Sequence, residues 1–411
     1  MDGNRQTRIL ATLGPATDSV EAIGKLLDAG ANIFRLNMSH APHDWTRTTT
    51  VNIREAAAQR DLVPGILMDL QGPAIRTGDL PEPVELHQGD RFDFTVDPAV
   101  QGERVVGVNY SNFLNDIEVG ATILIDNGLI RMKVLTKTES VAECEVDIGG
   151  SMGSRRHINL PGTKVGLPAL TDKDRKDAAL GLELEVDYMA LSFVREAADV
   201  EELQALIKVG DHPTKVVAKI EDQHAVKRIR RIIRAADAIM VARGDLGVEC
   251  PYEELPIIQR HIVRECLTVG KPVVVATHML ESMINEPHPT RAEVTDVANA
   301  VFEQADAIML SGETSVGNFP TMCVEVMDRI AQRMEQERGA RFHREAKLDD
   351  QRQRLAKSAV RMADDLSAEA IVMFTVSGRM VRQAAWMRPR HAKILALCAD
   401  PRVAGALALH R

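Results

Sequence analysis

Lys215-Val-Val-Ala-Lys-Ile-Glu221 and Ala238-Ile-Met-Val-Ala-Arg-Gly-Asp245 are two short apolar runs that each end in charged residues. Between them, residues 222–237 place isoleucines at the spacing of one helical face. A strand, a helix and a second strand in this order are typical of a parallel sheet with helical crossovers. This stretch therefore predicts an α/β fold.

The same pattern recurs along most of the chain. Short β-branched runs alternate with segments of helical periodicity, and several helices have recognisable starts, such as Thr171 with Asp174 and Thr290 with Glu293. The runs predicted to be strands are residues 8–14, 32–39, 65–72, 187–194, 215–221, 238–245, 272–279 and 307–314. Because eight parallel strands can close on themselves, we expect a (β/α)8 TIM barrel.

One connection interrupts this pattern. The third run ends near residue 72 and the next helix begins only near residue 171, while the residues between them alternate as strands around a turn at Asp126-Asn-Gly128. We therefore expect a barrel formed by residues 1–78 and 168–340, with residues 79–167 inserted as an all-β lid, a small β-barrel. Residues 341–411 begin with a polar linker and continue with two helices and two strands, which predicts a truncated α/β C-terminal domain.

Composition limits the class of protein. Hydrophobic residues make up 45% of the 411 residues and charged residues 27%, which is typical of a globular protein, and the net charge of −9 disfavours nucleic acid and anionic lipid as partners. The first ten residues are polar, and the chain has no run of about 18 apolar residues, so we expect no membrane segment. Five scattered cysteines without a C-x-x-C pair favour reduced thiols and a cytoplasmic location.

Polar residues gather where the predicted strands end. In a parallel barrel these carboxyl ends surround one cleft, and alternate residues of a strand share a face, so the groups can converge. The strand-end residues are Arg35, Asn37, Ser39, Asp69, Lys219, Glu221, Arg243, Asp245, Thr277, Ser311 and Glu313. Any single pair could be a structural ion pair, but burying so many charges without a ligand is costly. The set suits a divalent cation together with an anionic substrate that carries phosphate or carboxylate.

Seven motifs at these positions resemble one enzyme family. They are Arg35-Leu-Asn-Met-Ser-His40, Asp69-Leu-Gln-Gly-Pro-Ala-Ile-Arg-Thr-Gly78, Lys219-Ile-Glu221, Met240-Val-Ala-Arg-Gly-Asp-Leu-Gly247, Ala276-Thr-His-Met-Leu-Glu-Ser-Met283, Pro289-Thr-Arg-Ala-Glu293 and Met309-Leu-Ser-Gly-Glu-Thr314. Their order is that of pyruvate kinases, and the resemblance extends from Thr7 to about residue 330. It implies an enzyme of the last step of glycolysis that transfers phosphate from phosphoenolpyruvate to ADP, giving pyruvate and ATP. It also implies Mg²⁺, usually K⁺, and a homo-oligomer, the family tetramer.

The resemblance also implies roles for individual residues. Glu221 and Asp245 would hold Mg²⁺, Lys219 would neutralise the phosphoryl group in flight, and Arg35 would bind its oxygens. The backbone amides of Gly244 and Asp245 would bind the substrate carboxylate.

Three further sets of roles follow from the same motifs. Thr277 lies where the enolate is protonated. Nucleotide contacts are implied for Arg76, His40 and Asn37. The K⁺ ligands would be Asn37, Ser39, Asp69 and the carbonyl of Leu70.

Four residues depart from the family pattern. Gln71 stands where a lysine is common, and Ala74 stands where a glutamate accompanies K⁺ dependence and a lysine accompanies independence. His278 replaces a glutamine beside Thr277, and Asn127 replaces an acidic residue in the lid turn. The K⁺ requirement is therefore left open by the sequence.

Two other functions are compatible with these residues. One is a metal-dependent aldolase or lyase of the same barrel type, which would also stabilise a pyruvate enolate with Glu221 and Asp245; Lys219 and the lid disfavour it. The other is a barrel that has lost turnover and serves as a binding module, an alternative prompted by Gln71 and the short C-terminal domain.

Overall fold

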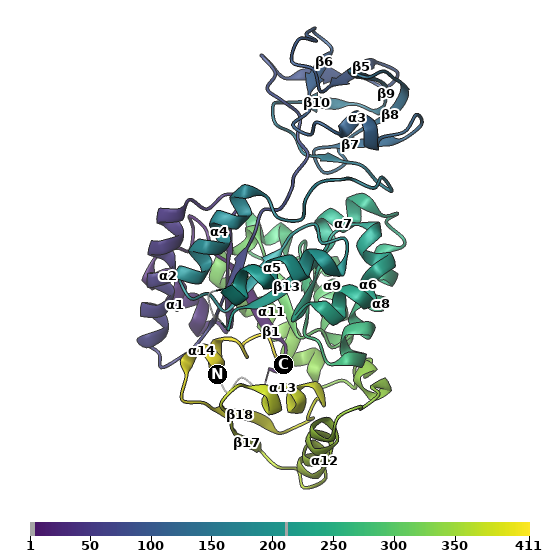
Figure 1. Ribbon diagram of the computed structural model, residues 1–411. Helices are drawn as coiled ribbons and strands as arrows, with labels where there is room; N and C mark the ends of the chain where they lie inside the picture. Colours follow the sequence, from purple (N-terminus) through teal and green to yellow (C-terminus); the bar gives the residue numbers. More distant parts are fainter. Residues whose placement is uncertain (1–4, 210–212) are drawn as a thin grey trace.

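The computed structural model describes residues 5–209 and 213–411. Its centre is a closed barrel in which every neighbouring pair of strands is parallel (Figure 1). In barrel order the strands are β1 (Arg8–Thr12), β16 (Ala307–Leu310), β15 (Val273–Ala276), β14 (Ala238–Ala242), β13 (Lys215–Ile220), β12 (Tyr188–Leu191), β3 (Gly65–Asp69) and β2 (Ile33–Asn37). The predicted TIM barrel is confirmed.

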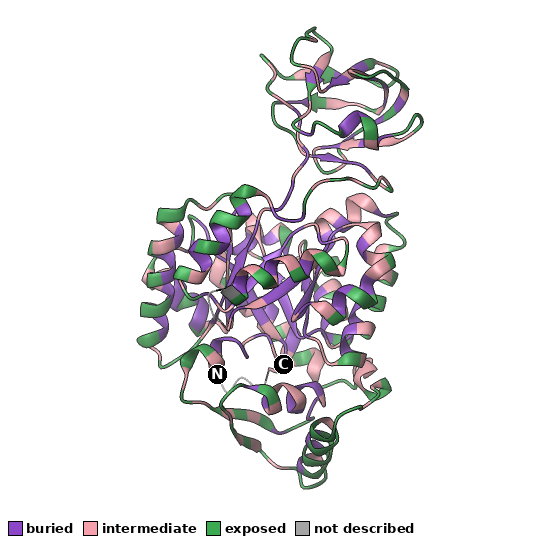
Figure 2. Cartoon of the chain, in the orientation of Figure 1, coloured by how far each residue is buried: buried purple, intermediate pink, exposed green. Residues whose placement is uncertain are grey.

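Helices cover the outside of the barrel. The principal ones are α1 (Val20–Asp28), α2 (His43–Ala58), α4 (Asp172–Glu183), α5 (Ala197–Val209), α6 (Gln223–Ala235), α8 (Leu255–Val269), α9 (Arg291–Phe302) and α11 (Pro320–Glu335). The capping boxes predicted at Thr171 and Thr290 begin α4 and α9. Figure 2 shows the strands as an almost continuous buried core, because their inner and outer faces are both covered.

Several strands are shorter than predicted. β14 ends at Ala242 and a short helix, α7 (Arg243–Glu249), begins at once. After β15 the chain turns at Thr277 and His278, whose φ angles are positive, and enters the 3₁₀ helix η1 (Glu281–Ile284). After β16 it enters α10 (Gly312–Ser315). The polar residues at these strand ends therefore do not follow the alternation of an extended chain.

The segment inserted after β3 is built mainly of strands. A six-stranded sheet has the order β11 (Ile158–Asn159), β7 (Thr122–Ile125), β8 (Ile130–Lys137), β9 (Val141–Ile148), β5 (Arg91–Thr95) and β6 (Val105–Gly107). A ladder of β4 (Val84–Leu86) with β10 (Gly150–Met152) and a short helix, α3 (Phe113–Asp116), complete it. The predicted hairpin turn joins β7 to β8, with Asp126 and Asn127 at positive φ. We call this unit the lid, because it stands beyond the carboxyl ends of the barrel strands (Figure 1).

The last part of the chain lies at the opposite end of the barrel from the lid (Figure 1). It contains η2 (Phe342–Glu345), α12 (Gln351–Asp365), β17 (Ala370–Phe374), α13 (Arg379–Trp386), β18 (Lys393–Leu397) and α14 (Pro401–Gly405), and β17 pairs with β18 in parallel. Trp386 donates from Nε1 to the carbonyl of Leu267 at 2.6 Å, and Leu409 packs into the barrel interior. These contacts join the C-terminal unit to the barrel.

Two findings bear on the expected environment. Within residues 5–209 and 213–411, no helix has the length and apolar character that crossing a bilayer requires. The five cysteines are all free thiols, and four of them are buried.

Candidate active site

A cavity of about 370 Å³ lies between the carboxyl ends of the barrel strands and the lid. Seven polar residues of the barrel line this cavity. Six of them were predicted at strand ends, namely Arg35, Asn37, Ser39, Lys219, Glu221 and Asp245, and the seventh is Ser192. The connections and the lid contribute Gln71, Ala74, Arg76, Asp126, Asn127, Ser154, Arg155, Arg156 and His157, and Phe193 completes the lining. The predicted convergence of strand ends is therefore observed for β2, β13 and the start of α7.

A continuous chain of charges crosses the floor of this cavity. Arg35 Nε lies 2.7 Å from Oδ2 of Asp69, and Lys219 Nζ lies 3.3 Å from the other oxygen of Asp69 and 2.9 Å from Oε1 of Glu221. Lys219 also donates to Ser192 Oγ at 2.7 Å. The two carboxylates are almost fully buried, while Arg35 and Lys219 keep 11% and 12% of their side chains exposed. Arg35, Lys219 and Glu221 line the cavity, whereas Asp69 lies outside its lining.

The surroundings of these groups fix their charges. Burial favours the neutral form of Lys219, but the carboxylates of Asp69 and Glu221 outweigh it and raise the pKa of the ammonium above its usual range. Burial also opposes ionisation of Asp69, but Lys219 and Arg35 lower the pKa of that carboxyl. Lys219 is therefore a permanent cation at neutral pH.

Glu221 is the residue best prepared for a metal ion. Its Oε2 accepts from the backbone N–H of Phe193 at 2.5 Å. Its Oε1 is buried and has no hydrogen-bond partner among the described residues, although the Lys219 ammonium is close enough for an ion pair. Burial, opposed by the charge of Lys219 and assisted by that of Asp245, raises the pKa of the Glu221 carboxyl to about 7. A bound cation would share this oxygen with Lys219 and favour the ionised form.

Glu221 and Asp245 suit Mg²⁺ better than they suit a metal ion that takes all its ligands from the protein. In the part of the chain that the structure describes, no group of three or more His, Cys, Asp or Glu side chains is arranged to hold a metal. Glu221 and Asp245 nevertheless line the same cavity. Mg²⁺ commonly takes one or two carboxylates and fills its remaining positions with water and substrate oxygens.

Arg243 does not enter the cavity, contrary to the expectation that it would converge with Asp245. Because α7 begins at Arg243, the side chain turns outward, donates to the carbonyls of Ala276 and Thr277, and pairs with Asp296 at 2.6 Å. The residue is 7% exposed. Arg243 holds the turn after β15 in place and is a structural residue.

Thr277 and Gly244 meet at the edge of the site. The backbone N–H of Gly244 donates to Thr277 Oγ1 at 2.7 Å, and that hydroxyl donates to the carbonyl of Ala276 at 2.7 Å. Neither residue lines the 370 Å³ cavity. The Thr277 hydroxyl therefore accepts the hydrogen bond of the Gly244 amide, to which the family resemblance assigns the substrate carboxylate.

At the predicted end of the eighth strand, Glu313 has structural contacts, and the Ser311 hydroxyl is buried without a hydrogen-bond partner among the described residues. The Glu313 carboxylate is 2% exposed and accepts from the backbone N–H groups of Leu280 and Ser311 at 3.1 and 2.6 Å. It thereby holds the segment after β15 against the end of β16. The expectation that this strand end contributes to the cleft is wrong.

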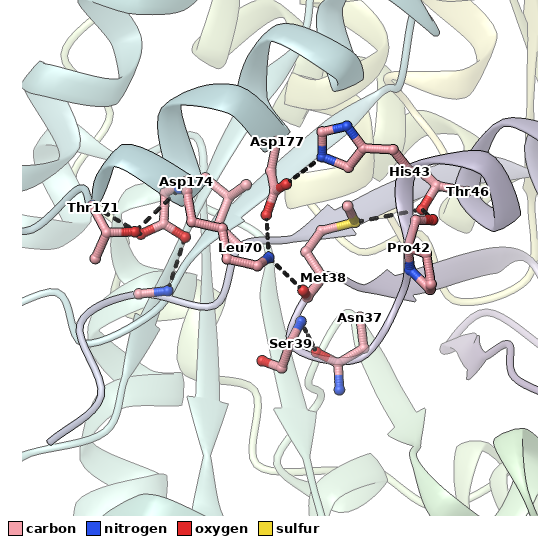
Figure 3. A network of polar contacts seen from close by, with 12 residues as sticks. Asn37, Met38, Ser39, Pro42, His43, Thr46, Leu70, Thr171, Asp174 and Asp177 are labelled. Carbon is pink, nitrogen blue, oxygen red and sulfur yellow. Dashed lines mark hydrogen bonds and ion pairs between the residues drawn. The ribbon is translucent and has the colours of Figure 1, made fainter. Parts of the chain in front are cut away.

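The four predicted K⁺ ligands lie near one another but are largely engaged. Asn37 Oδ1 accepts from the backbone N–H of Ser39 at 3.2 Å, as Figure 3 shows. The carbonyl of Leu70 accepts from Ser192 Oγ at 2.8 Å, and the Asp69 carboxylate already faces two cations. Their oxygen donors have the chemistry that K⁺ requires, but an ion would have to share each of these three with a present partner.

Helix α4 supports this part of the site from behind (Figure 3). Asp174 accepts from the backbone N–H of Gly72 at 3.0 Å, and Asp177 accepts from His43 and Lys173 at 2.7 and 2.6 Å. Lys173 also donates to the carbonyl of Met38 at 2.6 Å. Two fully buried carboxylates thus fix the segments that follow β2 and β3, where Asn37, Ser39 and Leu70 lie.

Sequence reasoning missed two groups of cavity residues. Ser192 and Phe193 follow β12, so the same strand-end argument would have found them had it been applied to the fourth strand. Arg155, Arg156 and His157 come from the lid and approach the barrel only after folding. The adjacent arginines in a mainly β segment were the sequence feature that could have indicated an anion-binding role. His40, by contrast, is exposed and does not line the cavity.

Comparison with known proteins agrees with this geometry. The family model for the pyruvate kinase barrel domain matches residues 4–324, and the model for the pyruvate kinase alpha/beta domain matches residues 353–411. The chain belongs to the pyruvate kinase family. As a member of it, the chain is an enzyme of the phosphotransferase class, and its TIM barrel, lid and α/β unit are those of a pyruvate kinase fold.

Individual pyruvate kinases resemble the whole chain. Plastidial pyruvate kinase 3, a chloroplastic protein of Arabidopsis thaliana, is 43% identical over 414 residues, which cover 100% of this chain and 72% of that protein. The pyruvate kinase of Geobacillus stearothermophilus is 40% identical, over 98% of this chain and 70% of its own length. A crystal structure of a pyruvate kinase from Cryptosporidium parvum superposes with a TM-score of 0.95 at 38% identity, over 99% of this chain and 86% of the other.

Proposed function

We propose that this pyruvate kinase transfers the phosphoryl group of phosphoenolpyruvate to ADP, giving pyruvate and ATP. The observation that carries the proposal is the position of Lys219, a cation that lines the cavity and is held between Asp69 and Glu221. Phosphoryl transfer needs fixed positive charge and accurate placement more than it needs covalent chemistry.

In the proposed reaction, Arg35 and Lys219 bind the oxygens of the phosphoryl group. Glu221 and Asp245 would hold Mg²⁺, which when bound supplies positive charge to substrate oxygens. A phosphate oxygen of ADP attacks phosphorus, the bond from phosphorus to the enol oxygen breaks, and Lys219 neutralises the charge that moves between them. Because the Lys219 charge is held by two buried carboxylates, no rearrangement is needed at the moment of transfer.

The Thr277–Gly244 contact suggests how the enolate is protonated. When the substrate carboxylate binds the amides of Gly244 and Asp245, it replaces the Thr277 hydroxyl as the acceptor of the Gly244 N–H. The released hydroxyl can then orient a water that protonates the methylene carbon of the enolate. Binding of the carboxylate would thereby prepare the final step.

We assign the nucleotide phosphates to the part of the cavity that Arg76, Arg155 and Arg156 line. Arg76 lies on the connection to the lid, and Arg155 and Arg156 come from the lid itself, so three guanidinium groups surround the space. Arg155 and Arg156 are paired with Asp79 and Asp126 at 2.8 and 3.2 Å, so the nucleotide phosphates would share these cations with the two carboxylates. Asn37 lines the same cavity, whereas the nucleotide contact of His40 stays a prediction.

Several sequence predictions also stay open. They are the domain limits at residues 78, 168 and 340, the K⁺ requirement, the homo-oligomeric state, and the cytoplasmic location, which differs from the chloroplastic location named for two plant relatives.

The proposal is tested by an assay in which pyruvate is coupled to NADH oxidation by lactate dehydrogenase. Phosphoenolpyruvate, ADP and Mg²⁺ should give turnover, and parallel reactions with and without K⁺ decide the monovalent requirement. Lys219→Met should lower kcat by roughly 10³-fold. Lys25→Met, which removes an exposed lysine on α1, is the control and should leave the rate unchanged.

Two outcomes would overturn the proposal. Absence of turnover in a wild-type protein that still binds Mn²⁺ would favour a binding module. Pyruvate released from a hydroxy-keto acid, but not from phosphoenolpyruvate, would favour the aldolase alternative.

A further inference from the structure

Helix α7 contacts the lid at one end and the proposed metal site at the other. Its first turn carries Asp245, which lines the cavity with Glu221. Its last residue, Glu249, accepts a hydrogen bond at Oε1 from Asn159 Nδ2 of the lid strand β11 at 3.3 Å. The helix is only seven residues long, so a shift at one end moves the other.

A second contact joins the same end of α7 to the lid. A Cβ placed on Gly128, in the turn between β7 and β8, would lie 3.7 Å from Cγ1 of Val248. The turn therefore lies beside α7, close enough that a side chain at Gly128 would contact Val248. Because β11 pairs with β7, and Gly128 lies in the turn that follows β7, both contacts come from the same sheet of the lid.

Glu249 is also tied to the metal site through the barrel. Its backbone carbonyl accepts from Gln223 Nε2, and Gln223 follows Glu221 by two residues. Glu249 thus connects three segments: the lid strand with Asn159, the helix with Asp245, and the segment after β13 with Glu221.

The hydrogen bond between Asn159 and Glu249 lies beside a small cavity and has few other polar partners in the described part of the chain. A second cavity, of about 70 Å³, is lined by Asn159, Glu249, Asp222 and His224, and it shares Glu221 with the main cavity. Asn159 is 5% exposed, and its Oδ1 has no hydrogen-bond partner among the described residues. Burial raises the pKa of Glu249 to about 7, and the Asn159 hydrogen bond opposes that shift. The Asn159 amide is thus the side-chain hydrogen-bond donor that stabilises the carboxylate.

We infer that Glu249 is a positioning residue that transmits the position of the lid, through its hydrogen bond with Asn159, to the metal ligand Asp245. Lid placement over the substrates and assembly of the Glu221–Asp245 pair would then occur together. The inference rests on the proposed function, because Asp245 is taken as a metal ligand there.

The test compares Glu249→Ala, Asn159→Ala and the double variant with the wild-type protein. Mn²⁺ affinity is measured without substrate, and hydrogen–deuterium exchange is followed in residues 73–79 and 160–167, which connect lid and barrel. Each single variant should weaken Mn²⁺ binding by about 3- to 10-fold and raise exchange in both connections. The double variant should be no worse than the worse single variant, because both remove the same contact.

Two controls separate this role from a general loss of stability. Glu249→Gln keeps a hydrogen-bond acceptor for Asn159 and should restore most of the Mn²⁺ affinity. Thr136→Ala removes an exposed lid contact with Glu143, far from α7, and should change neither readout.

Additive effects of the two single variants would overturn the inference. So would unchanged Mn²⁺ affinity and unchanged exchange in Glu249→Ala, even if its melting temperature fell. Both readouts are independent of turnover. Failure of the coupled assay would therefore refute the proposed function without deciding this one.

Discussion

The ammonium group of Lys219 lies 3.3 Å from Oδ1 of Asp69, a carboxylate whose side chain is only 2% exposed. The pair is part of the floor of the cavity, so the residue proposed to neutralise the transferring phosphoryl group also balances buried negative charge. Removing one partner of a buried ion pair leaves the other uncompensated, which commonly costs about 3 kcal/mol or more.

Lys219→Met should therefore lower stability as well as turnover. At pH 7.5 we expect a loss of about 3 kcal/mol, measured by chemical denaturation. Without the lysine, the pKa values of Asp69 and Glu221 rise in the folded state. The deficit relative to wild type should then shrink as the pH falls and the buried carboxyls bind protons. A stability difference that does not change between pH 7.5 and 5 would contradict this account.

Arg243 and Arg35 should respond differently to substitution by lysine. Arg243→Lys cannot maintain the two carbonyl contacts and the Asp296 pair together, so we expect a loss of about 2 kcal/mol and a lower kcat through displacement of Thr277. Arg35→Lys should mainly raise KM for phosphoenolpyruvate. Thermal melts and steady-state kinetics on both variants distinguish the structural role of Arg243 from the substrate-binding role of Arg35. Equal effects on KM would mean that Arg243 reaches the substrate.

Asp187 should make stability depend on pH. Burial raises the pKa of this carboxyl to about 7, and the hydrogen bond that it accepts from the Ile66 N–H at 2.8 Å only partly opposes the shift. Between pH 4 and 7 the folded state therefore binds more protons than the unfolded state, so the free energy of unfolding falls as the pH rises.

Asp187→Asn should remove this dependence. The variant should be more stable than wild type by about 2 kcal/mol at pH 8, and the difference should disappear near pH 4. Asp79→Asn, in an exposed pair with Arg155, is the control and should show no such gain. A constant difference at all pH values would show that Asp187 is ionised in the folded protein.

Gly270 should be essential for attaching the C-terminal unit to the barrel. Its φ is +74°, and a Cβ there would lie 2.5 Å from Cδ2 of Trp386, so Gly270→Ala is strained and also displaces the ring. We expect a loss of about 3 kcal/mol and faster proteolysis near α13. Gly89→Ala has a similar φ of +87° with no atom within 4 Å, so it should lose only about 1 kcal/mol. Equal losses would mean that Trp386 does not hold the unit.

Most of the fold could be predicted from local signals. β-Branched runs and capping boxes are properties of short segments, so the eight barrel strands and the starts of α4 and α9 were identified correctly. The lid turn at Asp126-Asn-Gly128 was also predicted correctly, because positive φ at all three positions restricts the residue types. Strand ends were less accurate, since short helices begin there and local patterns do not show where an extended chain stops.

The candidate site divides in the same way. Arg35, Lys219 and Glu221 lie on or next to regular strands, so their alternation predicted that they would face the cavity. Arg243 and Glu313 lie in the short helices that follow strands, and there the neighbouring backbone groups determined the direction of the side chain. Arg155 and Arg156 are far along the chain from the barrel residues with which they line the cavity. No local sequence pattern predicts that such distant segments meet.

By itself, the sequence determined the barrel, the inserted lid and the chemical character of the strand ends. The tertiary structure alone decided which polar residues face the cavity, and that Glu249 contacts the lid. The physical reason is that backbone periodicity is fixed by neighbours in the chain, whereas the direction of a side chain beyond a strand is fixed by the partners it finds after folding.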